Sequence, residues 1–157
     1  MSPKLDLIDL RILRELMADG RLTNVALSKR AGISAPPCLR RVRALEQSGL
    51  ISGYHADVDV ERLGFSVTAY VMVTLHNQAE RDLRAFEDRA LGWAMVREAH
   101  MLSGESDYIL KCVARDLTAF QDFLLNTVSA TPNVASVKTN VAIRRVKYEP
   151  GVALIAG

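Results

Sequence analysis

Six lysine and arginine side chains make up the strongest chemical signal in this 157-residue chain. They lie between Asp19 and Glu46, where no acidic residue occurs, and they are Arg21, Lys29, Arg30, Arg40, Arg41 and Arg43. Residues 1–54 hold nine basic against five acidic side chains, whereas residues 55–157 hold eleven against thirteen. A base-only segment in an otherwise balanced chain favours a polyanionic partner, although a solvated helix face would give the same pattern.

A second candidate site is the segment Gly104-Glu105-Ser106-Asp107, which lies between two predicted strands. Exposed backbone N–H groups in such a turn can bind a carboxylate, and an acidic side chain can bind an ammonium group. Those are the two charged groups of an amino acid. Gly and Asp equally suit a plain hairpin turn that binds nothing, so the residues alone leave both interpretations open.

The other reactive residue types follow no catalytic or metal-binding pattern. Cys38 and Cys112 lie 74 positions apart, which fits neither a disulfide framework nor a zinc site. We interpret them as small core residues in a reducing compartment, with a redox sensor as the alternative. His55, His76 and His100 are scattered along the chain, and no phosphate loop or nucleophile motif occurs. The sequence therefore predicts no enzyme, no cofactor and no metal site.

The composition predicts a folded protein outside the membrane. Apolar residues make up 49% of the chain, enough for a substantial core. No apolar run approaches the roughly 20 residues that span a bilayer. The N-terminal stretch MSPKLDLIDL has acids where a signal peptide needs an apolar block. We expect a soluble, cytoplasmic protein with no membrane partner.

Three predicted helices position the basic residues. The first has apolar residues at three- and four-residue spacing and ends near Gly20; they are Leu5, Ile8, Ile12, Leu13 and Leu16. Thr23 can cap a short helix over residues 24–31 whose inner face is Leu27 and Ala31, and Gly32 then turns the chain. Ser34 can cap a third helix that runs to about Gln47. Its first turn contains Pro36 and Pro37, where proline costs little because those N–H groups have no intrahelical acceptor.

The third helix has an apolar face and a basic face. At 100° per residue, Cys38, Val42 and Leu45 share one side, and Arg40 and Arg43 lie opposite. A short helix, a glycine turn and a basic second helix form a helix-turn-helix, whose second helix enters the major groove of double-stranded DNA. We assign to the groove Ser34, Ala35, Pro36, Pro37 and Arg40. We assign to the DNA backbone and its surroundings Asn24, Ser28, Lys29, Arg30, Arg41 and Arg43.

The second half alternates strand and helix patterns in the order β-α-β-β-α-β. Strands are predicted over residues 66–75, 94–103, 107–114 and 134–148, and helices over 79–91 and 117–128. The first of these helices has an apolar stripe of Leu83, Phe86, Ala90 and Leu91. This order favours a ferredoxin-like fold, with both helices on one face of an antiparallel sheet. The opposite face then needs a cover, which favours self-association through the sheet.

These patterns predict an α+β protein of two domains. Residues 1–54 form the helix-turn-helix domain, residues 55–65 the linker, residues 66–150 the ferredoxin-like domain, and residues 151–157 an irregular tail. The segment 51–65 is short and polar and is interpreted as a strand plus connector.

The sequence resembles the Lrp/AsnC family of transcriptional regulators, most closely its leucine-responsive branch. The resemblance covers about residues 5–148 and is carried by three segments: LDLIDLRILRELMADGRLTNVALSKRAGIS, PPCLRRVRALEQSGLISGY and MLSGESDYILK. It implies a sequence-specific DNA-binding regulator whose C-terminal, RAM-type domain pairs through its sheet into homodimers, which often assemble into octamers.

The resemblance also implies that an amino acid effector binds between C-terminal domains, near the GxxD loop. The residues implied to line that site are Met101, Leu102, Gly104, Ser106 and Asp107, together with Leu117, Asn140, Val141 and Ala142 from a neighbouring protomer. Asp107 is assigned the contact with the effector's ammonium group.

Two other functions remain open at this stage. The chain could be an architectural protein that wraps DNA around a disc of protomers and needs no effector, a hypothesis that calorimetry with the twenty amino acids would separate from the first. It could also be an enzyme, because some relatives with this layout are decarboxylases of a haem precursor. An absorbing cofactor in the purified protein would favour that alternative.

Overall fold

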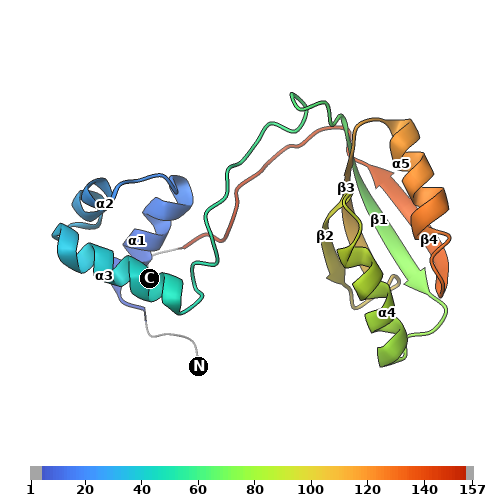
Figure 1. Cartoon of the computed structure of the whole chain (residues 1–157), viewed down its shortest axis with the longest axis horizontal. Coiled ribbons are helices and arrows are strands. Elements are labelled where there is room, and N and C mark those ends of the chain that lie inside the picture. Colours follow the sequence, from blue (N-terminus) through green and yellow to red (C-terminus); the bar gives the residue numbers. More distant parts are fainter. Residues whose placement is uncertain (1–4, 155–157) are drawn as a thin grey trace. The chain divides into compact units, whose positions relative to one another are not determined.

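The chain folds into two compact units, shown in Figure 1 for a computed structural model that describes residues 5–154. One unit comprises residues 1–57 and 147–157, and the other comprises residues 58–146. The end of the chain thus groups with the helical unit, whereas the sequence suggested a separate irregular tail. Residues 1–4 of the predicted first domain and residues 155–157 of the predicted tail lie outside the described residues.

The helical unit contains the three predicted helices. They are α1 (Leu7–Ala18), α2 (Asn24–Ala31) and α3 (Ala35–Gln47). Their predicted inner faces are confirmed, because the buried core consists of Ile12, Leu27, Ala31, Cys38 and Leu45. Gly20 does not end α1, whose C-cap is Asp19 in an extended conformation. Gly32 does turn the chain, with a φ of 74° in the left-handed region that favours glycine.

The first two helices begin at side-chain caps. Asp6 Oδ1 accepts hydrogen bonds from the backbone N–H groups of Ile8 and Asp9, both at 2.9 Å. Asp9 Oδ2 accepts in return from the N–H of Asp6 at 3.1 Å, which completes a capping box. At the start of α2, Thr23 Oγ1 accepts from the N–H of Ala26 at 3.2 Å, as the sequence predicted.

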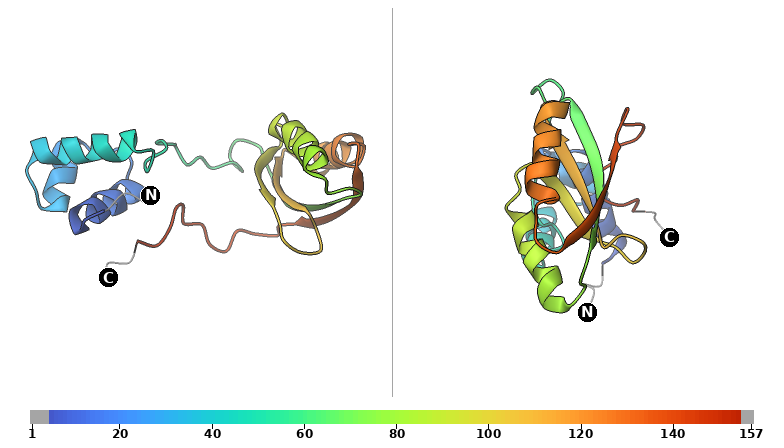
Figure 2. Two further views of the ribbon diagram at one scale, coloured as in Figure 1. Left: turned by 90° about the horizontal axis from the view of Figure 1, so that it is seen from below. Right: turned by 90° about the vertical axis from the view of Figure 1, so that its right-hand side faces the viewer.

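The second unit is an antiparallel sheet with two helices on one face (Figures 1 and 2). Its elements are β1 (Val67–Leu75), α4 (Glu80–Leu91), β2 (Val96–Met101), β3 (Tyr108–Ala114), α5 (Leu117–Phe123), the π-helical turn η1 (Leu124–Val128) and β4 (Val134–Val141). The strand order β2-β3-β1-β4 is that of the predicted ferredoxin-like fold. The predicted helix over 117–128 is therefore α5 followed by a π-helical turn.

The core of this unit lies between the sheet and the helices. Alternate residues of β1 and β3 are buried. The centroid of the Phe86 ring of α4 lies 4.7 Å from that of the Tyr108 ring and 5.7 Å from that of the Trp93 ring. The intervening residues, such as Tyr70 and Ile109, point to the opposite face, where they are half-buried or exposed. That face is the one that the sequence predicted to need a cover.

Three details of the sequence prediction are wrong in this unit and its linker. No strand forms within residues 51–65, and the last strand ends at Val141 instead of residue 148. The last ladder bond runs from the N–H of Ala142 to the carbonyl of Thr68 at 2.8 Å, near the start of β1, so no strand lies beside the following residues. Leu91 is 85% exposed and does not belong to the buried stripe of α4.

Candidate DNA-binding and effector sites

The tip of α3 has an unusual start. Ser34 occupies the N-cap position with extended backbone, but its hydroxyl makes no capping hydrogen bond. An N-cap side chain normally accepts from the second or third N–H of its helix, and in α3 those residues are Pro36 and Pro37, which have no N–H. The Ser34 side chain therefore stays at the exposed tip without a capping role.

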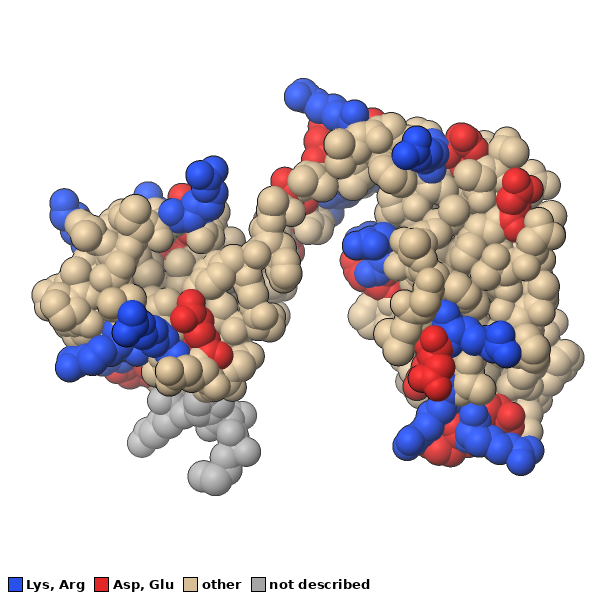
Figure 3. Space-filling view, in the orientation of Figure 1, with Lys and Arg blue, Asp and Glu red and all other residues tan. Residues whose placement is uncertain are grey.

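Three exposed cations next to the tip of α3 engage no carboxylate within residues 5–154. They are Lys29 at the end of α2 and Arg40 and Arg43 on α3. Figure 3 shows basic side chains projecting from this unit, with few acidic ones on the face drawn. Arg40 and Arg43 lie on the side of α3 opposite the buried Cys38 and Leu45. This arrangement leaves a basic surface next to the tip of α3.

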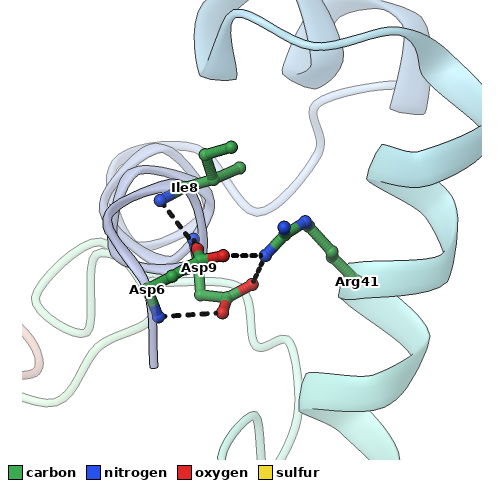
Figure 4. A network of polar contacts seen from close by, with 4 residues as sticks. All are labelled: Asp6, Ile8, Asp9 and Arg41. Carbon is green, nitrogen blue, oxygen red and sulfur yellow. Dashed lines mark hydrogen bonds and ion pairs between the residues drawn. The ribbon is translucent and has the colours of Figure 1, made fainter. Parts of the chain in front are cut away.

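Arg41 has a different environment from its neighbours (Figure 4). Its Nη1 lies 2.7 Å from Asp6 Oδ2 and 2.7 Å from Asp9 Oδ1, so α3 is bonded to the start of α1. The hydrogen bonds to Asp9 and Asp6 raise the pKa of Arg41. The N–H of Asp9 and the Arg41 guanidinium lower the pKa of Asp6. This geometry does not support the expected phosphate contact of Arg41, and we reassign the residue to positioning α3.

Three other predicted DNA contacts have internal partners. Ser28 is 4% exposed and its hydroxyl donates to the carbonyl of Val25 at 2.9 Å, a geometry that does not support its predicted DNA contact. Asn24 is half-buried and its Nδ2 donates to the carbonyl of Ala35 at 2.8 Å, which joins the starts of α2 and α3. Arg30 is exposed but paired with Glu15 at 3.0 Å.

Sequence reasoning missed the residues that hold the recognition helix. Asp6 and Asp9 are three residues apart at the start of α1, and this capping-box spacing is the sequence signal that could have indicated them. Tyr54 was assigned no role, yet its hydroxyl donates to Glu46 at 3.0 Å and its ring lies against Gly20, 3.3 Å from where a Cβ would be. It thereby anchors the segment after α3 to the helical unit.

In the second unit, the predicted effector loop is held by Asp107. Its backbone N–H donates to the carbonyl of Val73 at 2.9 Å, and its carbonyl accepts from the N–H of Leu102 at 2.7 Å. Asp107 Oδ2 accepts from the N–H of Leu75 at 2.7 Å, where the register of β1 with β4 shifts between Thr74 and Leu75. Asp107 Oδ2 thus provides an acceptor for the N–H of Leu75 at this irregularity of the strand pairing.

The other residues predicted for the effector loop differ in exposure. Met101 and Leu102 are 59% and 38% exposed, Gly104 is exposed, and Ser106 is 9% exposed. Met101 also lines an open groove of about 400 Å³ between α4 and β2. Across the loop, Lys138 Nζ lies 3.8 Å from Glu105 Oε2. The loop is therefore a surface feature with one buried hydroxyl-bearing residue.

The predicted effector residues form two groups that lie at opposite ends of β1. The loop adjoins Val73 and Leu75, whereas Asn140 and Val141 pair with Tyr70 and Ala69, and Ala142 follows them. Leu117, at the start of α5, is 61% exposed and follows the strand end that pairs with Val67. At ~3.3 Å per residue, the two groups are on the order of 15 Å apart. A single protomer does not bring them together.

Comparison with known proteins identifies the family of this chain. Residues 5–52 match the model of a winged helix-turn-helix DNA-binding domain, and residues 68–152 match that of the Lrp/AsnC ligand binding domain. The chain belongs to the Lrp/AsnC family. It is a DNA-binding transcriptional regulator with a ligand-binding domain, and not an enzyme, as its sequence predicted. A Leucine-responsive regulatory protein of Rhizobium meliloti (strain 1021) is 54% identical over 144 residues, which are 92% of each chain.

Other Lrp/AsnC members are similar over nearly their whole length. A Bkd operon transcriptional regulator of Pseudomonas aeruginosa is 42% identical over 143 residues, covering 91% of this chain and 94% of that one. The crystal structure of a Neisseria meningitidis transcriptional regulator in complex with L-Met has a TM-score of 0.92 at 32% identity, covering 96% of this chain and 97% of that one. The predicted helix-turn-helix and ferredoxin-like architecture is thereby confirmed.

The described residues lack two other classes of site. No helix among residues 5–154 is long and apolar enough to cross a membrane. The same residues contain no group of three His, Cys, Asp or Glu side chains that could hold a metal ion.

Proposed function

We propose that this Lrp/AsnC regulator inserts the tip of α3 into the major groove and adjusts its DNA binding in response to an amino acid held between copies of its C-terminal domain. The observation that carries the DNA half is the basic surface beside that tip. Lys29, Arg40 and Arg43 are exposed and engage no carboxylate among the described residues, and Ser34 keeps its hydroxyl for an outside partner.

The residues divide between the two tasks of DNA recognition. Ser34, Pro36 and Arg40 face the bases, because the N-terminal residues of a recognition helix reach the groove floor and arginine pairs with guanine O6 and N7. Pro37 and the half-buried Ala35 complete the stiff tip. Lys29 and Arg43 bind phosphates, which fix the register on the duplex without reading sequence. Arg30 joins them only if its pair with Glu15 opens.

The effector half is supported by Gly104. Its φ lies outside the left-handed region, and an added Cβ would meet no atom within 4 Å, so neither backbone conformation nor packing within the protomer requires glycine there. A ligand or a second copy that approaches the loop closely would require it. Asp107 supplies the negative charge: Oδ2 serves Leu75, and we assign the ammonium of the amino acid to Oδ1.

A complete effector site needs two chains. A single amino acid cannot reach from the loop to the second group of predicted effector residues on the same sheet, so Leu117, Asn140, Val141 and Ala142 come from a neighbouring protomer. The open sheet face provides one route to a homodimer, and assembly of dimers to an octamer provides further contacts. The protein acts in the cytoplasm on double-stranded DNA.

The experiment is a pair of titrations on the full chain. Genomic fragments recovered with the protein give a duplex for fluorescence anisotropy, and the twenty amino acids are titrated by calorimetry. We expect one or a few amino acids to give heat and to change the Kd for the duplex. Gly104→Val should abolish that heat and leave DNA binding without amino acid unchanged. Absence of heat with all twenty amino acids would overturn the effector half and favour an architectural protein.

A further inference from the structure

The first helix carries a second apolar stripe outside the three-helix core. Ile8, Ile12, Leu13 and Leu16 are the α1 residues that pack into that core. A different line along the helix, at four- and three-residue spacing, contains Leu7, Leu10, Arg14 and Met17, of which Leu7 is 60% and Met17 is 39% exposed. A helix with apolar residues on two sides is expected to pack against a neighbour on each side.

The C-terminal segment lies on this second stripe. Arg14 Nη2 donates to the carbonyl of Leu154 at 3.0 Å, and Leu154 is half-buried. Gly151 has a φ of 82°, and a Cβ at that position would lie 2.7 Å from Met17 Cε, closer than side-chain atoms approach. The positive φ favours glycine at 151, and any larger residue there would displace the Met17 methyl group, so residue 151 lies directly against Met17.

The same segment continues directly from β4. Residues 147–157 group with the helical unit although they follow a strand of the other unit, so the chain joins the two units twice, at residues 57–58 and at residues 146–147. β4 carries Asn140 and Val141, which the proposed function places at the effector site. α1, at its other end, is bonded through Asp6 and Asp9 to Arg41 of α3.

We propose that residues 147–154 form a docking segment on the Leu7–Leu10–Arg14–Met17 stripe and link the effector site to the recognition helix. The second clause rests on the proposed function, whereas the docking does not. The segment is not fully buried: beside the Arg14–Leu154 hydrogen bond and the Gly151–Met17 contact, Val152 is still 69% exposed. It can therefore open and close, as a coupling element between two sites must.

The docking is tested on the full chain by NMR of methionine labelled with ¹³C at its methyl group, with the Met17 signal assigned through Met17→Leu. Removal of residues 147–157 and Gly151→Val should both shift the Met17 signal. Gly64→Val is the matched control, because Gly64 has a φ of 83° but nothing within 4 Å of an added Cβ, so it carries the strain without the contact. A Met17 signal that is the same in the parent and in the truncated chain would overturn the docking.

The coupling is tested by the ratio of the duplex Kd with and without L-methionine or L-leucine at millimolar concentration. In Gly151→Val this Kd ratio should move at least about threefold closer to one, whichever side of one it has in the parent. The calorimetric affinity for the amino acid should stay as in the parent. A shifted Met17 signal with an unchanged ratio would overturn the coupling. A parent whose duplex Kd is the same with and without either amino acid would overturn both the coupling and the role of these two amino acids as effectors. The Met17 signal would still test the docking.

Discussion

Arg41 of the recognition helix lies 2.7 Å from Asp9 of the first helix, through Nη1 and Oδ1, and 32 residues of sequence separate the two. The Asp9 side chain is 15% exposed and the Arg41 side chain 32% exposed, so the pair is partly shielded from water. Since Asp9 also belongs to the capping box of α1, a single carboxylate fixes both where the first helix begins and how the third helix is held.

This relationship predicts a coupling energy between the two side chains. In a double-mutant cycle of Arg41→Gln and Asp9→Asn, the coupling should be roughly 1 kcal/mol, a value reduced from that of a buried pair because Arg41 is about one-third exposed. Urea unfolding monitored by circular dichroism measures it. Arg43→Gln is the control and should change stability by less than about 0.5 kcal/mol. Strict additivity of the two substitutions would contradict the positioning role of Arg41.

The lowered pKa of Asp6 predicts a specific pH dependence. The folded pKa lies below the ordinary value of 3.8, so the stabilisation by the ionised carboxylate is complete above that value and is lost as the pH falls through the folded pKa. Asp6→Asn keeps a good N-cap through its remaining oxygen and removes the charge together with the acceptor for Arg41. The difference in Tm between the parent and this variant should be constant above roughly pH 5 and shrink below pH 3.8. A difference that persists unchanged in acid would refute this assignment.

Ser34 and Thr23 should respond oppositely to the loss of their hydroxyls. Thr23→Ala removes a formed cap and should cost about 1 kcal/mol of stability. Ser34→Ala removes a side chain that caps nothing, because Pro36 and Pro37 offer no N–H, and should change stability by less than about 0.5 kcal/mol. It should nevertheless weaken binding to the specific duplex roughly fivefold, the effect of one hydrogen bond. If the two variants lose equal stability, Ser34 is an ordinary cap.

Two substitutions of Asp107 separate its structural role from its ligand role. Asp107→Asn keeps an oxygen for the N–H of Leu75 and removes the negative charge, so the fold should hold while calorimetric affinity for the amino acid falls at least about tenfold. Asp107→Ala leaves that N–H unpaired and should in addition cost about 1–3 kcal/mol in urea unfolding. An Asn variant that binds amino acids as tightly as the parent would remove Asp107 from the ammonium contact.

Local patterns predicted the elements well because the local rules and the fold agree. The spacing of Leu27 and Ala31, the Thr23 cap and the Gly32 turn all appear where expected. The overlong last strand shows the limit: apolar residues such as Ile143 and Val146 continue the strand pattern, but a strand needs a neighbour, and β1 begins at Val67. The sequence of residues 142–148 does not show whether a neighbouring strand lies beside them.

The structure departs from the site predictions where one residue type serves two purposes. Arg41 and Arg43 are both arginines of one basic helix, and only the position of Asp6 and Asp9 in space separates a positioning residue from an exposed cation. Ser28 was predicted to contact DNA, but its hydroxyl donates to the carbonyl of Val25 inside its own helix. Such long-range or backbone partners are invisible to spacing, whereas the exposed face of α3 follows directly from helical periodicity.

The most direct test of the account is the salt dependence of binding to the specific duplex, because it counts the phosphate contacts. We predict that log Kobs falls linearly with log salt, and that Lys29→Gln and Arg43→Gln each reduce the slope by about 0.9, while Arg41→Gln leaves the slope unchanged. Arg40→Ala should instead narrow the gap between specific and random duplex. If the triple variant of Lys29, Arg40 and Arg43 keeps the parent's slope and its affinity for both duplexes, α3 is not the DNA-binding element.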